Sequence, residues 1–504
     1  MTTQTTSGEE TLKRIPGARA FAKELAPSYI DHACMMNGYQ PPPGSPLGEG
    51  VDAGFSYCEL DCGSAVTETL LAAANPLGNF TAIDARGELL ERGRTLAKDG
   101  NVRNITFHEA SLEQALDLSL PPFDYIVVEG IYSWVPLRER AFVLAFVRKF
   151  LRPGGAVVVS YNARPGWNRL DPFRRIFREA THGLRAEPRQ RLAIARDIYA
   201  RLLDAKAPTL LASGLTPAAF ADLANVPEDV LAADYLNDYA EPLYVTEVAG
   251  DFAVVECVLA GTADMALSLA QATPHEPFKS TLERLPTIPG RELAKDMLAD
   301  TRFRRDVLIR GGQRLAADNH DMVMNGLAFA LEQPAELIRY DGHAPFGKLQ
   351  FDNPHAHKLV EILSHGPRTL GEIVAQSAGA DFQTVVANVH ALIITGQLRP
   401  VYRTSGEAAK NVRALQTAIR ARAASDDAIG FLPSPAGTAF AVPLVDQILM
   451  DMPAHRSADV MAEETLAKFV ASGRAFSDRE ALLRRARSFR RNLQYYATLG
   501  VAPV

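Results

Sequence analysis

The chain has 504 residues, of which 47% are hydrophobic and 22% are charged. This length and apolar content predict about two to four globular domains with substantial cores. The formal net charge of -6 at pH 7 provides no general attraction for nucleic acid, so no nucleic-acid partner is expected. No apolar run reaches the ~18 residues of a membrane span, and the polar N-terminus lacks the pattern of a signal peptide. A cytoplasmic location is therefore expected.

The cysteines and the basic pairs are interpreted as structural features. The four cysteines, Cys34, Cys58, Cys62 and Cys257, are too few and too scattered for a disulfide framework, and Cys58 and Cys62 lack a second pair for zinc. We therefore predict no metal site. Basic pairs such as Arg304-Arg305 are interpreted as solvated helix faces.

Short apolar runs alternate with helical stretches from about residue 55 to residue 165. The predicted strands are Phe55–Leu60, Phe80–Asp84, Ile105–Glu109, Tyr125–Glu129 and Ala156–Tyr161, with helices near 66–75, 87–99 and 138–151. This alternation predicts an α/β fold with a parallel sheet and covered faces. A ligand would lie beyond the carboxyl ends of the strands, where Gly63, Asp84, Ser111 and Gly130 fall.

The loop after the first strand is the most informative segment. Gly63 precedes Asp84 by about the 20 residues of a nucleotide-binding βαβ unit, which predicts a bound adenosine. Glycines would be expected at positions 61, 63 and 65, but Asp61 and Ala65 occupy two of them. Aspartate tolerates a positive φ, and alanine adds only a methyl group. A purely structural strand-loop-helix unit is the alternative.

Acidic residues surround this loop. The carboxylate of Asp84 can accept bonds from both ribose hydroxyls, or it can cap the following helix. Arg86 would instead suit the 2′-phosphate of NADP. Glu59 and Asp61 place negative charge where a pyrophosphate would lie, which favours S-adenosylmethionine over a dinucleotide. Ser111 could reach adenine or cap a helix.

Aromatic residues follow the fourth and fifth strands. Tyr132 and Trp134 come directly after Glu129-Gly130, and Tyr161, Asn162 and Trp167 follow the later strand. Aromatic rings at this edge can enclose an aliphatic amine and face a cationic sulfonium. Plain packing is the alternative for each ring. Farther along, Arg169 to Leu211 is predicted as one long charged helix. Three later segments, Leu359–Ser364, Thr369–Ser377 and Phe382–Thr395, follow one another with the winged-helix rhythm of a small helical module.

These motifs resemble class I S-adenosylmethionine-dependent methyltransferases, and more narrowly the bacterial family with a methyltransferase regulatory domain, which includes rickettsial-type protein lysine methyltransferases. The segments that carry the resemblance are Pro27-Ser28-Tyr29, Phe123–Ile126, Gly130–Val135, Ser160-Tyr161-Asn162, Pro165-Gly166-Trp167, Tyr235-Leu236-Asn237, Glu241–Tyr244, Phe303–Val307 and Arg310-Gly311. They span most of the chain.

The resemblance implies a Rossmann-like methyltransferase sheet, a small regulatory domain and a mostly helical C-terminal region. The expected divisions are an N-terminal helical lid over 1–45, a methyltransferase domain over 46–210, a regulatory domain over 211–300 and a helical, winged-helix-like region over 301–504. It implies S-adenosylmethionine as cofactor. The cofactor residues would be Glu59, Asp61, Gly63, Ala65, Asp84, Ser111 and Gly130; Tyr132, Tyr161 and Glu129 would be catalytic, and Trp134, Asn162 and Trp167 would contact the substrate.

The chain departs from the family at the cofactor loop and near the transfer site. The family has Glu-x-Gly-Cys-Gly-x-Gly, and a histidine where Glu129 stands. The resemblance implies N-methylation of a protein lysine or another amine, whereas the departures suggest an altered function. We therefore keep two alternatives: a catalytically degenerate binding or regulatory subunit, and a small-molecule methyltransferase. A protein substrate or partner and a homo- or hetero-oligomer are expected.

Overall fold

The computed structural model describes residues 21–47, 54–212, 228–269, 276–316, 323–345, 347–377, 379–403, 406–425, 427–453, 455–472 and 479–502. Residues 1–20 of the expected N-terminal lid, and 213–227 and 270–275 of the expected regulatory segment, lie outside these ranges. None of the helices in the described ranges is both long enough and apolar enough to cross a membrane.

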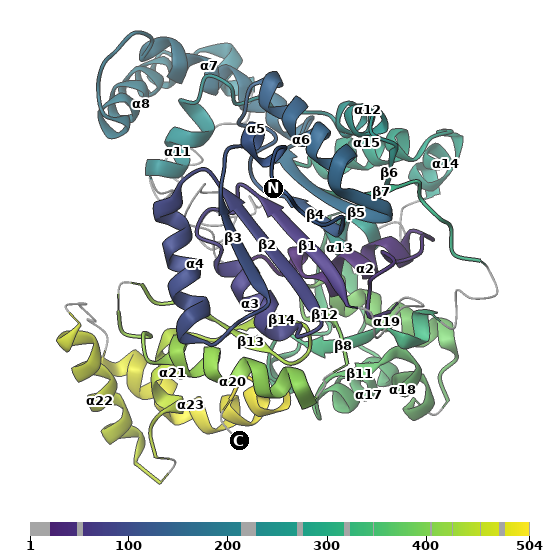
Figure 1. Cartoon of the computed structure of the whole chain (residues 1–504), viewed down its shortest axis with the longest axis vertical. Helices are drawn as coiled ribbons and strands as arrows, with labels where there is room; N and C mark the ends of the chain where they lie inside the picture. The colour runs from purple at the N-terminus through teal and green to yellow at the C-terminus, as the bar shows by residue number, and fades with distance from the viewer. Residues whose placement is uncertain are drawn as a thin grey trace.

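A seven-stranded sheet forms the centre of the molecule (Figure 1). Its strand order is β3-β2-β1-β4-β5-β7-β6. The first five strands are mutually parallel, whereas β7 runs antiparallel to both of its neighbours. The bounds are β1 Phe55–Leu60, β2 Gly78–Asp84, β3 Ile105–Glu109, β4 Phe123–Val128, β5 Leu151–Asn162, β6 Cys257–Thr262 and β7 Phe303–Arg310. The predicted α/β fold with a Rossmann-like methyltransferase sheet is confirmed.

The last two strands come from a distant part of the sequence. β6 follows helix α12 (Val245–Ala253), and β7 follows helix α15 (Ile288–Ala299). β7 pairs with β5 from Ala156↔Ile309 to Asn162↔Phe303. Part of the segment that was expected to form a separate regulatory unit therefore completes the same sheet as the cofactor loop.

The prediction of one long helix from Arg169 to Leu211 is wrong. The chain forms α7 (Asp171–Ala180), α8 (Pro188–Asp204) and α9 (Pro208–Ala212). Gly183 has a φ of 71° in the first break, a left-handed conformation that interrupts a right-handed helix. Pro188 and Pro208 each begin a new helix, where a missing backbone N–H costs nothing.

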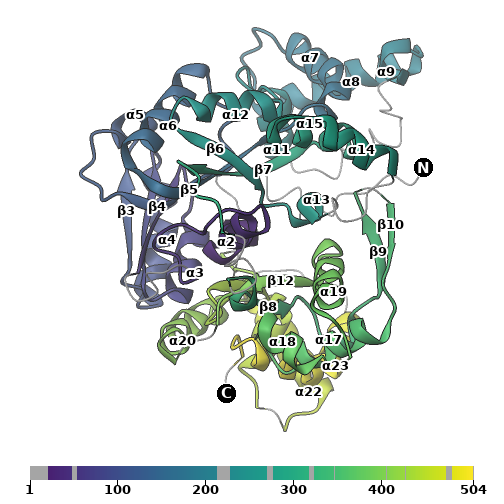
Figure 2. The same ribbon diagram turned by 90° about the vertical axis from the view of Figure 1, so that its right-hand side faces the viewer.

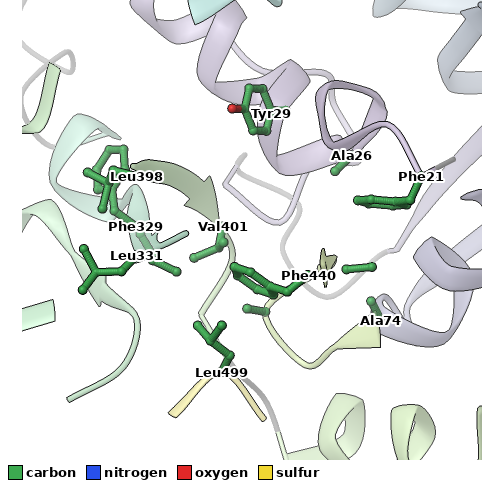
Figure 3. Close-up of a cluster of buried hydrophobic side chains, with 14 of the residues drawn as sticks. Phe21, Ala26, Tyr29, Ala74, Phe329, Leu331, Leu398, Val401, Phe440 and Leu499 are labelled. Atoms are coloured by element: carbon green, nitrogen blue, oxygen red, sulfur yellow. The ribbon is translucent and has the colours of Figure 1, made fainter. Parts of the chain in front are cut away.

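The two faces of the sheet are covered differently (Figures 1 and 2). One face packs against α5 (Leu112–Ala115), α6 (Leu137–Phe150), α12 and α15. The opposite face packs against α2 (Pro27–Met36), α3 (Val66–Ala74) and the C-terminal region. Helix α4 (Gly87–Asp99) lies beside α3 and β3. Apolar residues from both ends of the chain thus meet in one core; Figure 3 shows Phe21, Ala26 and Tyr29 together with Phe329, Val401, Phe440 and Leu499.

The C-terminal region combines helices with small sheets. Helices α17 (Pro354–Leu363), α18 (Leu370–Gln376) and α19 (Phe382–Ile394) match the three segments with winged-helix rhythm. They pack around a three-stranded sheet of order β11-β8-β12. The remaining elements are η1 Lys23–Leu25, η2 Gly166–Arg169, α11 Glu228–Tyr235, α13 Met265–Leu269, α14 Glu276–Arg284, β8 Ala328–Leu331, η5 Ala335–Leu337, β9 Asp341–Ala344, β10 Gly347–Gln350, β11 Arg368–Thr369, β12 Leu398–Val401, α20 Gly406–Arg420, β13 Phe431–Ser434, β14 Thr438–Ala441, α21 Leu444–Met450, α22 Ala458–Ala471 and α23 Arg479–Thr498.

Candidate functional site

The loop between β1 and α3 has the backbone of a glycine-rich loop although only one of its three key residues is glycine. Asp61, Gly63 and Ala65 have φ values of 54°, 64° and 51°, all in the left-handed region. For alanine this conformation costs about 1–2 kcal/mol, and aspartate tolerates it better because its short side chain bonds locally. The substitutions therefore preserve the path of the loop.

Asp84 closes β2 and is fully engaged by protein donors. Its Oδ2 accepts from the Gly63 backbone N–H at 2.7 Å and from Arg86 Nη2 at 3.0 Å. Its Oδ1 accepts from the Arg86 backbone N–H at 2.8 Å and from Arg86 Nε at 3.0 Å. Burial raises the pKa of Asp84, but the bonds from Arg86 and Gly63 outweigh it and hold the pKa below its usual value. Arg86 Nη2 also lies 3.5 Å from Asp61 Oδ1.

Two further acids lie on the α3 side of β1. Glu59 at the end of β1 and Glu68 in the first turn of α3 are each 1% exposed. Burial and these two carboxylates raise the pKa of Tyr57 well above its ordinary value. Buried carboxylates beside this loop would favour a cationic ligand group there.

The last predicted cofactor residues lie at neighbouring strand ends. The Gly130 N–H donates to Ser160 Oγ at 2.6 Å, and Gly130 has a φ of 70°. Ser111 caps α5 in a reciprocal capping box with Gln114. Its hydroxyl thus has the helix-capping role that was weighed against contact with adenine, at the carboxyl end of β3.

Glu129 is held by a bidentate ion pair. Arg305 Nη2 lies 2.7 Å from Glu129 Oε1, and Arg305 Nε donates to both carboxylate oxygens at 3.1 and 3.0 Å. Arg305 Nη1 is also 3.9 Å from Glu24 Oε2, beside α2. The Glu129 carboxylate is 2% exposed, so its negative charge is neutralised inside the protein.

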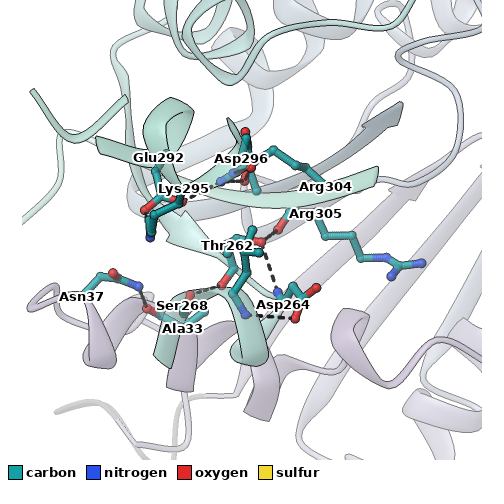
Figure 4. Close-up of polar contacts among 12 residues, drawn as sticks. Ala33, Asn37, Thr262, Asp264, Ser268, Glu292, Lys295, Asp296, Arg304 and Arg305 are labelled. Atoms are coloured by element: carbon teal, nitrogen blue, oxygen red, sulfur yellow. Dashed lines mark hydrogen bonds and ion pairs between the residues drawn. The ribbon is translucent and has the colours of Figure 1, made fainter. Parts of the chain in front are cut away.

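The Tyr161 side chain lies on the face of the sheet that α12 and α15 cover, opposite to the side of Arg305. Its hydroxyl donates to Asp306 Oδ2 at 2.5 Å. Burial and the neighbouring Asp306 raise the pKa of Tyr161 well above its ordinary value. Asp306 also accepts from Arg304, which pairs with Glu292 at 2.8 Å and Asp296 at 2.6 Å from α15. Figure 4 shows Arg304 directed toward α15 and Arg305 directed away from it.

The interpretation of Arg304-Arg305 as a solvated helix face is therefore wrong. Both residues belong to β7, Arg304 is 1% exposed and the Arg305 side chain is 13% exposed. Adjacent strand residues face opposite sides of a sheet, which separates the two guanidinium groups. The sequence alone offered no usable signal for these ion pairs, because Asp296 and Glu129 come within reach of the two arginines only when β7 is placed in the sheet.

The Tyr-Ser-Trp segment after β4 is fastened to the residues around 234–251. The Tyr132 hydroxyl donates to Asp251 Oδ2 at 2.8 Å, and Trp134 Nε1 donates to Asp234 Oδ1 at 3.1 Å. The Glu241 N–H donates to the Ser133 carbonyl at 2.7 Å. Tyr132 is fully buried and Trp134 is 7% exposed. The side chains of Tyr132 and Trp134 are thus buried and hydrogen-bonded, which holds this segment in place.

Asn162 and Trp167 occupy different surroundings. The Asn162 N–H donates to Ser133 Oγ at 2.9 Å, and its buried side-chain Oδ1 accepts no hydrogen bond from the described residues. Trp167 is 2% exposed and packs in a separate aromatic cluster, with its ring 5.8 Å from that of Tyr235. Asn162 therefore offers an acceptor near the strand ends, whereas Trp167 anchors η2.

Ten of the thirteen predicted residues fall into three groups. Glu59, Asp61, Gly63, Ala65 and Asp84 gather around the first loop, and Glu129, Gly130 and Asn162 lie at the ends of β4 and β5. The hydroxyls of Tyr132 and Tyr161 are directed toward α12 and the α15 side. A separate hollow of about 640 Å³ lies between the end of α2, β6, α14 and α15, and none of the predicted residues lines it. Within the described ranges, no group of three or more His, Cys, Asp or Glu residues could hold a metal ion.

Comparisons with known proteins match this arrangement. Residues 58–155 match the model of a methyltransferase domain, and residues 227–310 match that of a predicted methyltransferase regulatory domain. The second match includes β6 and β7. The cofactor loop and the two strands that complete the sheet thus belong to two family models that meet in one fold.

One relative and one solved structure resemble the chain over most of its length, and a second relative resembles part of it. An uncharacterized protein of Synechocystis sp. is 28% identical over 436 residues, which is 85% of each chain. An uncharacterized Rickettsia prowazekii protein is 29% identical over 148 residues, covering 29% of this chain and 56% of that one. The structure of PKMT2 from Rickettsia typhi in complex with AdoHcy has a TM-score of 0.66 at 16% identity, covering 94% of this chain and 98% of that one.

Proposed function

Because the chain belongs to the S-adenosylmethionine-dependent methyltransferases that carry a methyltransferase regulatory domain, we propose that it N-methylates an amine, with a protein lysine as the favoured acceptor. The observation that carries the proposal is the loop from Asp61 to Ala65, which keeps three left-handed residues and donates from Gly63 to Asp84. A left-handed backbone at these three positions is the conformation that glycine adopts readily, so Asp61 and Ala65 leave the path of a glycine-rich cofactor loop unchanged. The lysine acceptor is favoured because the chain also resembles PKMT2 in fold.

The acids around the loop suit the cofactor. We assign the ribose to Asp84, because a carboxylate has two acceptor oxygens for a vicinal diol. We assign the charged methionine end to the Glu59 side of the loop, where buried negative charge favours a cation. The left-handed residues Asp61, Gly63 and Ala65 shape the loop between these two sites. Gly130 and Ser111 would border the adenosine from the next strand ends.

Methyl transfer asks little covalent chemistry of the protein. S-adenosylmethionine supplies the activated methyl group on its sulfonium, and the protein orients a neutral nucleophile in line with it. Asn162 Oδ1 is the acceptor we assign to the substrate amine, since it is buried and accepts no bond from the described residues. Glu129, paired with Arg305, would orient the amine or receive its proton.

The aromatic residues support this site. The hydroxyls of Tyr132 and Tyr161 are engaged by Asp251 and Asp306. We therefore assign the Tyr132 ring to the wall of the transfer pocket, and Tyr161, on the opposite face of the sheet from Arg305, to a supporting role behind it. Trp134 extends the wall that the Tyr132 ring forms. Trp167 anchors η2, the short helix that follows Asn162 in the chain. A low-dielectric, aromatic surround lowers the pKa of a lysine amine and so favours its reactive neutral form.

A catalytically silent binding subunit is the alternative that one observation favours. The two oxygens of Asp84 carry four protein hydrogen bonds, which is the full acceptor capacity of a carboxylate. A residue that must hold a ribose is thereby occupied. Direct measurement of cofactor binding separates the two functions.

The first experiment is titration calorimetry with S-adenosylhomocysteine on the full chain and on Asp84→Asn. Binding by the wild type that Asp84→Asn weakens at least tenfold would support the cofactor site. Asp117→Asn, which removes an exposed carboxylate from the same domain, is the matched control and should bind like the wild type. Absence of heat from the wild type and from every variant would rule out the enzyme.

The second experiment identifies the acceptor. Tritiated methyl groups from labelled S-adenosylmethionine are followed in a cell lysate that is then separated by size. Label in protein bands supports the lysine proposal, whereas label confined to the small-molecule fraction supports the small-molecule alternative. Acid hydrolysis of labelled protein to methylated lysines would then confirm the acceptor atom.

A further inference from the structure

We propose that Arg86 is a latch on the ribose-binding carboxylate, so that cofactor binding must first displace the Arg86 guanidinium from Asp84. The inference rests on the proposed function, because it concerns the same site. It assigns to Arg86 a role in setting the affinity of this chain for its adenosyl ligand.

The bonds on Asp84 divide into a backbone pair and a side-chain pair. Oδ1 accepts from the Arg86 backbone N–H at 2.8 Å, and Oδ2 accepts from the Gly63 backbone N–H at 2.7 Å. The guanidinium adds one bond to each oxygen, from Nε to Oδ1 at 3.0 Å and from Nη2 to Oδ2 at 3.0 Å. Each oxygen thus holds one fixed donor and one movable donor.

The movable pair has the donor pattern of a ribose. A vicinal diol presents two adjacent O–H donors, one for each carboxylate oxygen, and a guanidinium presents two N–H donors in a similar fork. Since a carboxylate accepts about four bonds, the diol and the guanidinium compete for the same two positions. The backbone bonds from Gly63 and Arg86 can remain when a ribose binds.

The Arg86 side chain can move away from Asp84. Its side chain is 37% exposed, whereas that of Asp84 is fully buried. Arg86 is the residue before the first turn of α4, so its side chain can turn toward solvent while its backbone N–H stays on Asp84. Breaking the pair costs the cofactor part of its binding energy, because charge-assisted bidentate bonds are among the stronger hydrogen bonds.

Asp61 strengthens the latch. Arg86 Nη2 lies 3.5 Å from Asp61 Oδ1, so the guanidinium spans the acid in the loop and the acid at the end of β2. A glycine at position 61 would lack this second anchor. The substitution at 61 and the arginine at 86 therefore act on the same ion pair, and their effects on affinity should be non-additive.

The test is calorimetry with S-adenosylhomocysteine on the wild type, Arg86→Ala, Asp61→Asn and the double variant. We expect Arg86→Ala to bind about tenfold more tightly than the wild type, Asp61→Asn to bind slightly more tightly, and the double variant to match Arg86→Ala. Arg103→Ala removes an exposed arginine beyond α4 that bonds only locally to Asn101 among the described residues. It is the control for net charge and should match the wild type.

Four outcomes are informative. Tight binding by Arg86→Ala with weak or undetectable binding by the wild type supports the latch. Equal or weaker binding by Arg86→Ala beside a wild type that binds overturns the latch and leaves the proposed function standing. No binding by any variant, with unchanged thermal unfolding, overturns the proposed function and the latch together. Binding of NADP⁺ by the wild type that Arg86→Ala abolishes would assign Arg86 to a phosphate and overturn the latch.

Discussion

Tyr402 of the C-terminal region donates a hydrogen bond to Asp31 Oδ2 of helix α2 at 2.7 Å. The Tyr125 hydroxyl from β4 donates to Oδ1 of the same carboxylate at 2.7 Å, and Ser45 donates a third bond. Asp31 is fully buried. One carboxylate thus joins the N-terminal helix, the central sheet and the C-terminal region by hydrogen bonds.

The first prediction concerns the titration of Asp31. Burial raises the pKa of Asp31 from 3.8 to about 6, even though three hydroxyls donate to it. Because the folded pKa lies above the unfolded one, the folded state holds its proton longer; the stability this provides is present below about pH 4 and is lost as the pH rises through 6. A shift of about two units corresponds to about 3 kcal/mol.

Asp31→Asn should remove this loss of stability at rising pH, because asparagine does not ionise. We expect the free energy of unfolding of the variant to fall less steeply than that of the wild type between about pH 4 and pH 6. Urea denaturation at several pH values measures the two slopes. Asp117→Asn, at an exposed position, should retain the wild-type slope. Parallel curves for Asp31→Asn and the wild type would contradict the prediction.

The second prediction concerns the buried arginine of β7. Arg304 pairs with Glu292, Asp296 and Asp306, all of which are at most 3% exposed, and the buried Lys295 also pairs with Glu292. Arg304→Ala should destabilise the protein by about 3–5 kcal/mol, since it leaves the buried Asp296 and Asp306 without their cation. Arg302→Ala is the matched control, because that side chain is 52% exposed and lies 3.8 Å from Asp300. It should change the free energy of unfolding by less than about 1 kcal/mol.

Sequence reasoning succeeded where the signal was local. β1 and β3 begin and end at the predicted residues, and α4 covers 87–99 as expected. These elements alternate at short range, so periodicity identifies them. The partnership of β5 with β7 could not be read in this way, because about 140 residues separate the two strands and antiparallel pairing leaves no local pattern.

The same limit explains the misinterpreted arginines. A pair such as Arg304-Arg305 is usually solvated, and only the placement of β7 between β5 and β6 brings Asp296 and Glu129 into reach. The sequence shows Arg86 two residues after Asp84. The two hydrogen bonds from its side chain to the carboxylate, however, depend on the turn that begins α4. Side-chain pairing of this kind follows from tertiary geometry.

The third prediction concerns the wall of the transfer site. Tyr132→Phe removes the hydroxyl that donates to the partly buried Asp251 and should cost about 1–3 kcal/mol for the lost hydrogen bond to a charged group. If the loop positions the acceptor amine, kcat should fall about tenfold while the affinity for S-adenosylhomocysteine stays unchanged. Tyr239→Phe, at a residue that is 60% exposed, is the control. Equal loss of cofactor affinity and kcat would place Tyr132 at the cofactor instead.

The last prediction concerns the strained residue of the cofactor loop. Ala65 has a φ of 51° and Ala72 lies within the right-handed helix α3, and both are 0% exposed. Replacement by glycine removes one buried methyl group in each case, so the free-energy cost of that removal is common to the two variants. At position 65 glycine relieves a left-handed conformation worth about 1–2 kcal/mol, whereas at position 72 it costs about 1 kcal/mol of helix propensity.

Ala65→Gly should therefore be more stable than Ala72→Gly by about 2 kcal/mol. Chemical denaturation of the two variants under identical conditions measures the difference directly. Equal destabilisation would show that the backbone at position 65 is unstrained or relaxes in the variant. If Ala65→Gly is the more stable variant and also binds S-adenosylhomocysteine as well as the wild type does, the alanine costs the loop stability without altering its shape, because the backbone conformation that the ligand meets is already that of glycine.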